Sequence, residues 1–164
     1  MTVAIRRHRR ARYDCPGPTS SATTIVTTTR PVLSGRMNPP VEGETRTFER
    51  TFTVADVERF AELSGDAQPR HTDADEDGRV MVQGLLTATM PTKLGGDNEV
   101  LARTMEIEFI RPVYTGEHVT CRSTYETVAE RDDRYEFTSA VDCENEGGET
   151  VLRATIEGLI WKDA

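Results

Sequence analysis

The stretch FTVADVERFAELSGDAQPRH, residues 52–71, joins a segment with helical periodicity to a short polar run. In the first part, apolar residues recur at the spacing of a helix that packs one face on a core. Thr53 is placed to cap this helix, and Asp56 follows three residues later. The apolar stripe consists of Val54, Val57, Phe60, Ala61 and Leu63.

The polar run that follows places a carboxylate, Asp66, and an imidazole, His71, five residues apart around Pro69. Proline removes a backbone donor and disfavours helical geometry in the residue before it, so we expect a loop to set both side chains. A neighbouring Asp and His can hold and activate one water molecule. The same residue types also punctuate ordinary turns, so the spacing alone leaves both interpretations open.

A second helix is predicted over residues 80–94, which carry almost no charge and are therefore expected to be buried. Gly95-Gly96 is expected to end this helix. Gln83-Gly84 lies near its start, where backbone N–H groups have no partner within the helix.

Four segments with strand character follow the second predicted helix. In the first of them, Met105, Ile107 and Phe109 alternate with Glu106 and Glu108, which predicts one buried and one wetter face. The whole pattern indicates an α+β fold in which a helix lies against a curled antiparallel sheet. The predicted strands are 100–113, 118–128, 134–143 and 150–161.

Four ordered blocks, FTVADVERFAELSGD, DAQPRH, VQGLLTATM and FIRPVYTGE, give the chain a resemblance to a known family. From Thr45 to Trp161 it resembles the MaoC-like (R)-specific enoyl-CoA hydratases and dehydratases of the hot-dog fold. The resemblance implies that Asp66 and His71 activate water, and that the N–H of Gly84 receives the thioester oxygen. It also implies an acyl-CoA substrate, a homodimer and no metal or redox cofactor.

Three residues depart from the family pattern. Gln68 replaces the usual Asn, so the amide moves by one methylene and its orienting hydrogen bond is either lost or remade. Arg70 replaces a usual apolar residue, and Gln83 replaces the His that commonly precedes the Gly. Gln68 and Gln83 join Gly84 as candidate substrate-binding residues.

Charge divides the chain of 164 residues into two parts. Residues 1–36 carry seven Arg and one Asp, and we expect them to be a disordered basic arm, or to precede a true start at Met37. Residues 37–164 carry 13 Lys and Arg against 27 Asp and Glu, which indicates one acidic domain that does not bind nucleic acid. Such an acidic balance also resembles proteins of salt-loving cytoplasms.

The remaining composition points to a cytoplasmic protein. No apolar run approaches the roughly 20 residues that span a bilayer, so no membrane segment is expected. Cys15, Cys121 and Cys143 lack metal-ligand spacing and do not indicate a disulfide framework. His118 is expected at a surface or an edge, and residues 73–78 are interpreted as a solvated turn rather than a calcium loop.

Two other functions stay open beside the hydratase. A hot-dog thioesterase would, by the resemblance, usually place an acidic residue on the buried helix, and residues 80–96 contain none. A non-catalytic acyl-CoA-binding subunit is compatible with the departures at Gln68, Arg70 and Gln83.

Overall fold

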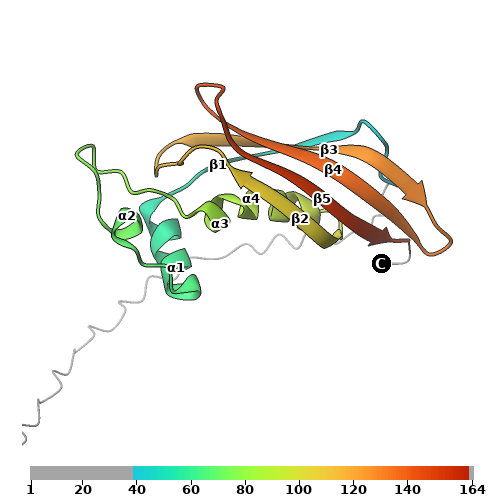
Figure 1. Ribbon diagram of the computed structural model, residues 1–164, viewed down its shortest axis with the longest axis horizontal. Coiled ribbons are helices and arrows are strands. Elements are labelled where there is room, and N and C mark those ends of the chain that lie inside the picture. The colour runs from blue at the N-terminus through green and yellow to red at the C-terminus, as the bar shows by residue number, and fades with distance from the viewer. Residues whose placement is uncertain (1–38, 163–164) are drawn as a thin grey trace, which may run out of the picture. The chain divides into compact units, whose positions relative to one another are not determined.

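The computed structural model describes residues 39–162, which form a five-stranded antiparallel sheet and four helices. The strand order is β1-β3-β4-β5-β2. Figure 1 shows the sheet curling over α3 and α4, with α1 and α2 beyond one end of it. This arrangement confirms the predicted α+β fold. The elements are β1 (Thr45–Thr51), α1 (Val54–Ser64), α2 (Pro69–Thr72), α3 (Gly84–Thr87), α4 (Thr89–Gly96), β2 (Leu101–Phe109), β3 (His118–Glu130), β4 (Arg134–Asn145) and β5 (Thr150–Trp161).

The first helix, α1, begins and ends as its sequence predicts. The side chain of Thr53 accepts a hydrogen bond from the N–H of Asp56, and the Asp56 carboxylate accepts one from the N–H of Thr53. This reciprocal capping box satisfies donors that a helix start otherwise leaves free. Gly65 ends the helix with φ of 77°, a left-handed conformation that glycine adopts readily.

The predicted helix over residues 80–94 is wrong in its first four residues. The helical segment begins at Gly84, is interrupted at Ala88 and continues to Gly96. Residues 80–82 are instead extended, and they exchange backbone hydrogen bonds with residues 113–115. The apolar run therefore contains an extended piece and a helical piece, which periodicity does not separate when both are buried.

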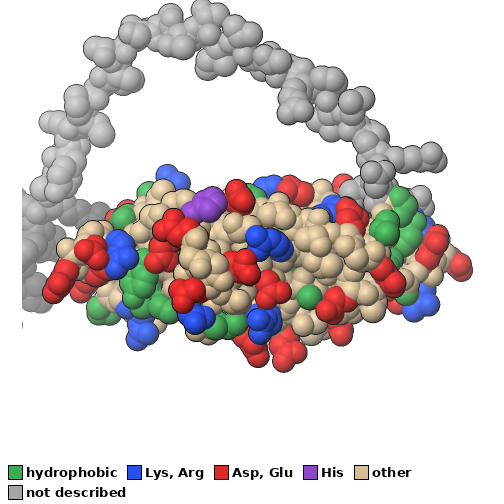
Figure 2. Space-filling view, turned by 90° about the horizontal axis from the view of Figure 1, so that it is seen from above, with side chains coloured by type: hydrophobic (Ala, Val, Ile, Leu, Met, Phe, Trp, Pro, Cys, Tyr) green, Lys and Arg blue, Asp and Glu red, His purple; other side chains and the backbone are tan. Residues whose placement is uncertain are grey.

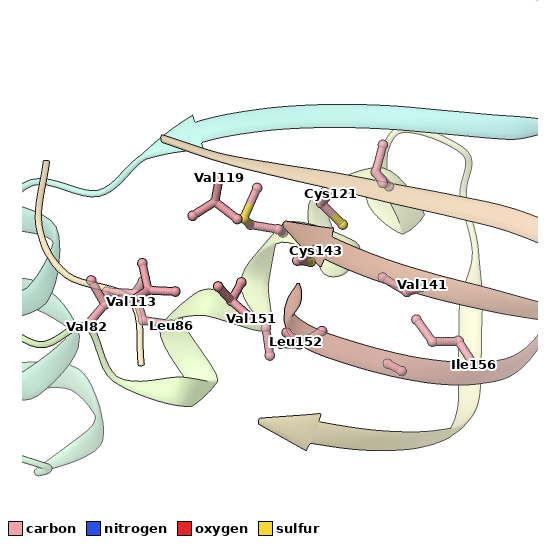
Figure 3. Packing of buried hydrophobic residues seen from close by; sticks show 14 of the residues in the cluster. Val82, Leu86, Val113, Val119, Cys121, Val141, Cys143, Val151, Leu152 and Ile156 are labelled. Carbon is pink, nitrogen blue, oxygen red and sulfur yellow. The ribbon is translucent and has the colours of Figure 1, made fainter. Parts of the chain in front are cut away.

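The core lies between the concave face of the sheet and the two central helices (Figure 3). Cys121 on β3 and Cys143 on β4 are cross-strand partners and are fully buried, so both act as small packing residues, as predicted. A hydrogen bond with Cys121, together with burial, raises the pKa of the Cys143 thiol. Cys15 lies outside the described residues.

The predicted alternation on β2 does not produce one buried face in the single chain. Met105 and Phe109 remain exposed, although they lie on the face that turns toward the helices. The reason is the position of β2 at the edge of the sheet, where it pairs with β5 on one side.

The surface of the described domain is strongly acidic. Figure 2 shows Asp and Glu side chains spread over the face it displays, with fewer Lys and Arg side chains among them. His118 is exposed at the start of β3, in agreement with its prediction. None of the described helices is long and apolar enough to cross a membrane. The predicted basic arm, residues 1–36, lies outside the described residues.

Candidate active site

Asp66 lies in the turn that follows α1, and several hydrogen bonds fix its position. The left-handed Gly65 donates its N–H to the Ala61 carbonyl at 2.8 Å and turns the chain away from the helix axis. The Ser64 hydroxyl then accepts the Asp66 N–H at 3.2 Å and donates to the Phe60 carbonyl at 2.6 Å. The Asp66 backbone is thus tied to the last turn of α1.

The Gln68 amide keeps an orienting hydrogen bond to Asp66. Its Nε2 donates to Asp66 Oδ1 at 2.8 Å. Asp66 Oδ2 stays free of this bond and lies 3.8 Å from Nε2 of His71. The extra methylene of Gln68 therefore does not prevent the contact, and one carboxylate oxygen remains available to a ligand.

His71 lies in the short helix α2 and not in the loop that the sequence predicted for both side chains. Pro69 occupies the first helical position, where its missing N–H removes no helical hydrogen bond. The imidazole is 7% exposed, and its Nδ1 lies 2.7 Å from the carbonyl oxygen of Met81. A carbonyl only accepts, so Nδ1 carries the proton of the neutral ring and Nε2 presents its lone pair toward Asp66.

The gap between Asp66 Oδ2 and His71 Nε2, 3.8 Å, is too long for a direct hydrogen bond. It is short enough for one water molecule to contact both atoms at about 2.8 Å. Such a water would find a proton acceptor on each side, which is the arrangement that general base catalysis requires.

Gln83 is 1% exposed and connects α1 with the turn that contains Asp66. Its Nε2 lies 3.2 Å from the carbonyl oxygen of Val57 on α1 and 3.5 Å from that of Asp66. Both neighbours are acceptors, which fixes the orientation of the amide. Among the described residues, Gln83 Oε1 has no hydrogen-bond partner.

Gly84 is the first residue of α3, so its N–H has no acceptor within the helix. A Cβ at this position would lie 3.0 Å from ring atoms of Phe109, closer than side chains normally approach. Glycine therefore lets the Phe109 ring pack against the helix start. The same ring lines the cleft beside the Gly84 backbone.

All five predicted site residues are close to one another in the fold. Four of them line one open cleft with a volume of about 600 Å³, namely Asp66, His71, Gln83 and Gly84, and Gln68 contacts the cleft through Asp66. One wall is apolar and includes Phe109, Ile110, Pro112, Val113 and Val151.

A second cavity, of about 220 Å³, lies between the end of α4 and the sheet. Its lining is mostly apolar and includes Leu94, Met105, Phe137 and Ile156. It contains no pair of acid–base side chains, so the chemistry of the cleft has no counterpart there.

Three contributors to the site were not predicted. The Met81 carbonyl sets the His71 tautomer, the Ser64 hydroxyl holds the Asp66 backbone, and Phe109 packs on Gly84. A backbone carbonyl carries no signal in the type of its residue, so Met81 could not be found from sequence. Ser64 precedes the Gly65-Asp66 turn, which is the one local signal that could have been used.

Residues 37–146 match the family described as MaoC like domain. No curated protein matches the chain. The fold is similar to that of the (R)-hydratase from A. caviae involved in PHA biosynthesis, with 23% identity, a TM-score of 0.65 and coverage of 72% of this chain and 95% of that one.

Two further solved structures share the fold. The ChsH1-ChsH2 complex from Mycobacterium tuberculosis has 20% identity, a TM-score of 0.60 and coverage of 74% and 98% of the two chains. A thioesterase superfamily member from Thermus thermophilus has 16% identity, a TM-score of 0.53 and coverage of 77% and 88%. These likenesses confirm the hot-dog fold.

Proposed function

The chain belongs to the MaoC-like domain family, and on that premise we propose that it is an (R)-specific enoyl-CoA hydratase or, in the reverse direction, a 3-hydroxyacyl-CoA dehydratase. The observation that carries the proposal is the Asp66–His71 pair at the cleft. Its free oxygen and free ring nitrogen are separated by 3.8 Å, and the Met81 carbonyl fixes the tautomer.

In the proposed mechanism, the thioester carbonyl oxygen accepts the Gly84 N–H. Negative charge develops on this oxygen as the β-carbon is attacked, so a donor aimed at it stabilises the transition state. A short helix start supplies such a donor without any side chain.

The water between Asp66 and His71 adds its oxygen to the β-carbon and gives one proton to the pair. The pair then returns a proton to the α-carbon, so that water has been added and the site is restored. Either Asp66 or His71 can serve as the base that takes this proton. Hydration transfers no electrons, so the proposal needs no redox cofactor, and the pair takes the place of a metal in activating water.

The test uses crotonyl-CoA and follows loss of the conjugated-thioester absorbance together with release of free thiol. We expect hydration without thiol release, and a loss of at least roughly a hundredfold in Asp66→Asn and in His71→Ala, as for removal of an acid–base partner. Matched controls are Asp132→Asn and His118→Ala, which alter exposed side chains outside the cleft.

Two other outcomes would replace the proposal. Thiol release at the rate of absorbance loss would indicate a thioesterase, for which the helical residues 84–96 offer no carboxylate. Binding of the thioester without turnover would indicate a non-catalytic acyl-CoA-binding subunit. Wild-type turnover in Asp66→Asn or His71→Ala would contradict the proposed role of the pair, although the protein would still be a hydratase.

We further propose that the working form is a homodimer formed through β2. The exposed apolar side chains of this edge strand, Met105 and Phe109, support the proposal. Phe109 also lines the cleft, so a second copy on β2 would cover part of the cleft wall.

A further inference from the structure

Almost every cationic side chain in this acidic domain has a carboxylate partner. Residues 39–162 contain 13 Lys and Arg against 26 Asp and Glu. Eleven of these cations form an ion pair with Asp or Glu. Within the described part of the chain, the two that do not are Arg59 and Arg70. An arginine that stays unpaired among so many carboxylates is available to an external anion.

The two unpaired arginines lie in different places. Arg59 is exposed on α1 and does not line the cleft. Arg70 is exposed on α2, directly before His71, and lines the cleft with it. The Arg70 carbonyl also accepts the N–H of Met81 at 3.2 Å, so its backbone is held to the segment that orients His71.

The other arginine of the cleft is already occupied. Arg111 Nε lies 3.4 Å from a carboxylate oxygen of Glu149, and its Nη1 donates to the Thr150 carbonyl at 3.2 Å. This ion pair matches the charge of Arg111 with a carboxylate. Arg70 is therefore the cleft cation whose charge is unmatched.

We propose that Arg70 binds an anionic group of the thioester substrate and so selects which substrates enter the cleft. The inference rests on the proposed function in taking the ligand to be a thioester. A guanidinium presents paired donors that match the oxygens of a carboxylate or a phosphate. The anion is either a phosphate of the pantetheine-bearing carrier or a carboxylate on the acyl group.

The negative charge in and around the cleft opposes an anionic ligand, and a nearby cation reduces that opposition. Asp66 lines the same cleft and repels a second anion, while the surrounding surface is acidic as well. Arg70 offsets this repulsion next to the reacting groups, since opposite charges attract over short distances. An uncharged acyl group on an uncharged carrier gains nothing from Arg70.

The test measures binding of saturated thioesters, which cannot be hydrated, by calorimetry at one fixed salt concentration. The ligands are butyryl-CoA, the phosphate-free butyryl-N-acetylcysteamine, and succinyl-N-acetylcysteamine, which bears a carboxylate. The proteins are the wild type, Arg70→Gln, Arg70→Lys and the matched control Arg59→Gln. Melting temperatures confirm that the variants remain folded.

We expect Arg70→Gln to weaken binding of an anionic thioester by about tenfold, as for loss of a hydrogen bond to a charged group. If the carrier phosphates are recognised, butyryl-CoA loses affinity. If an acyl carboxylate is recognised, succinyl-N-acetylcysteamine loses affinity. In either case Arg70→Gln binds butyryl-N-acetylcysteamine as the wild type does, and Arg59→Gln binds all three ligands as the wild type does. Arg70→Lys retains part of the affinity for the anionic ligand because it keeps the charge.

The proposal is overturned if Arg70→Gln binds both anionic thioesters as tightly as the wild type does. It is also overturned if Arg70→Gln loses as much affinity for the neutral thioester as for the anionic ones. The same holds if the wild type binds neither anionic ligand at millimolar concentration. If the protein binds an anionic thioester through Arg70 but does not hydrate crotonyl-CoA, the role of Arg70 is supported and the hydratase function is contradicted. The two proposals can therefore fail separately.

Discussion

At the scale of single residues, Gln68 shows how the site accommodates a longer side chain than the family pattern has. Its amide reaches Asp66 Oδ1 at 2.8 Å from an exposed position in the loop before α2. The loop geometry and the side-chain length therefore match each other, and the departure at Gln68 does not imply a decayed site.

We expect Gln68→Asn to lower turnover, because the shorter side chain withdraws the amide from Asp66 and loosens the carboxylate. Supporting hydrogen bonds of this kind are worth roughly ten- to a hundredfold in activity at other sites, so a loss within that range is expected. Steady-state kinetics with crotonyl-CoA measure it, with Gln68→Ala for comparison. An increase in turnover would instead show that Gln68 holds Asp66 in a poor position.

The sequence pointed to candidate side chains that the structure brings together, but not to the atoms that orient them. Asp66, His71 and Gly84 stand in a recognisable motif, and the structure brings them to one cleft. The role of the Met81 carbonyl depends on how two segments ten residues apart approach each other, which no residue type encodes. The missing partner of Arg70 is likewise a property of the folded surface.

At the scale of elements, the start of α1 combines several favourable contacts on one carboxylate. Asp56 accepts hydrogen bonds from the N–H and hydroxyl of Thr53, and Arg50 Nη2 donates to it at 3.0 Å. The hydrogen bonds from Thr53, with a contribution from Arg50, hold the pKa of Asp56 below its usual value.

We expect Asp56→Ala to lower the free energy of unfolding by about 1 kcal/mol at neutral pH, the usual effect of losing a cap. Because the folded state lowers the pKa of Asp56, this stabilisation is present above the unfolded carboxyl pKa of about 3.9 and is lost as the pH falls through the folded value. Denaturant unfolding at several pH values measures the difference, with Glu126→Ala as an exposed carboxylate control. A difference that stays constant below pH 4 would contradict the assignment.

Helix boundaries separate what local sequence encodes from what tertiary pairing decides. The start of α1 was predictable because the cap residues Thr53 and Asp56 lie within three positions of each other. The start of α3 was not, because residues 80–82 are held extended by residues 113–115, more than 30 positions away. Local patterns in an apolar run do not contain that information.

At the scale of the whole molecule, β2 presents an unpaired edge and exposed apolar side chains. An edge of this kind is a template for pairing with another chain, and two copies related by a two-fold axis can satisfy each other. The sequence predicted the strand, but the buried apolar face that its alternation predicted does not form in the single chain.

We therefore expect a dimer at micromolar concentration, and a monomer with reduced turnover in Met105→Lys, since a charge on the covered face would oppose pairing. Light scattering coupled to size-exclusion chromatography measures the mass. Leu63→Lys is the matched control, because Leu63 is an exposed apolar side chain on α1 and away from β2. A wild-type monomer would contradict the proposed dimer. Dissociation of the Leu63→Lys dimer would indicate that the interface includes α1.

The charge of the domain makes a prediction about salt. Residues 39–162 hold twice as many carboxylates as cations, so like-charge repulsion outweighs the attraction of the surface ion pairs. Added salt screens the repulsion and the attraction alike, because the Debye length at molar concentration is about 3 Å. Since the repulsion is the larger of the two, salt should raise the stability of the folded state. We expect the melting temperature to rise when KCl is increased from about 0.1 M to about 1 M.

A variant on α1 tests the cause of this rise. Glu58 and Glu62 are exposed and four residues apart on one helix, a spacing at which like charges repel. The double variant Glu58→Gln, Glu62→Gln should melt at a higher temperature than the wild type in low salt and gain less from added salt. Its far-ultraviolet circular dichroism should be unchanged. A wild-type melting temperature that does not respond to salt would show that repulsion among the carboxylates does not limit the stability of this fold.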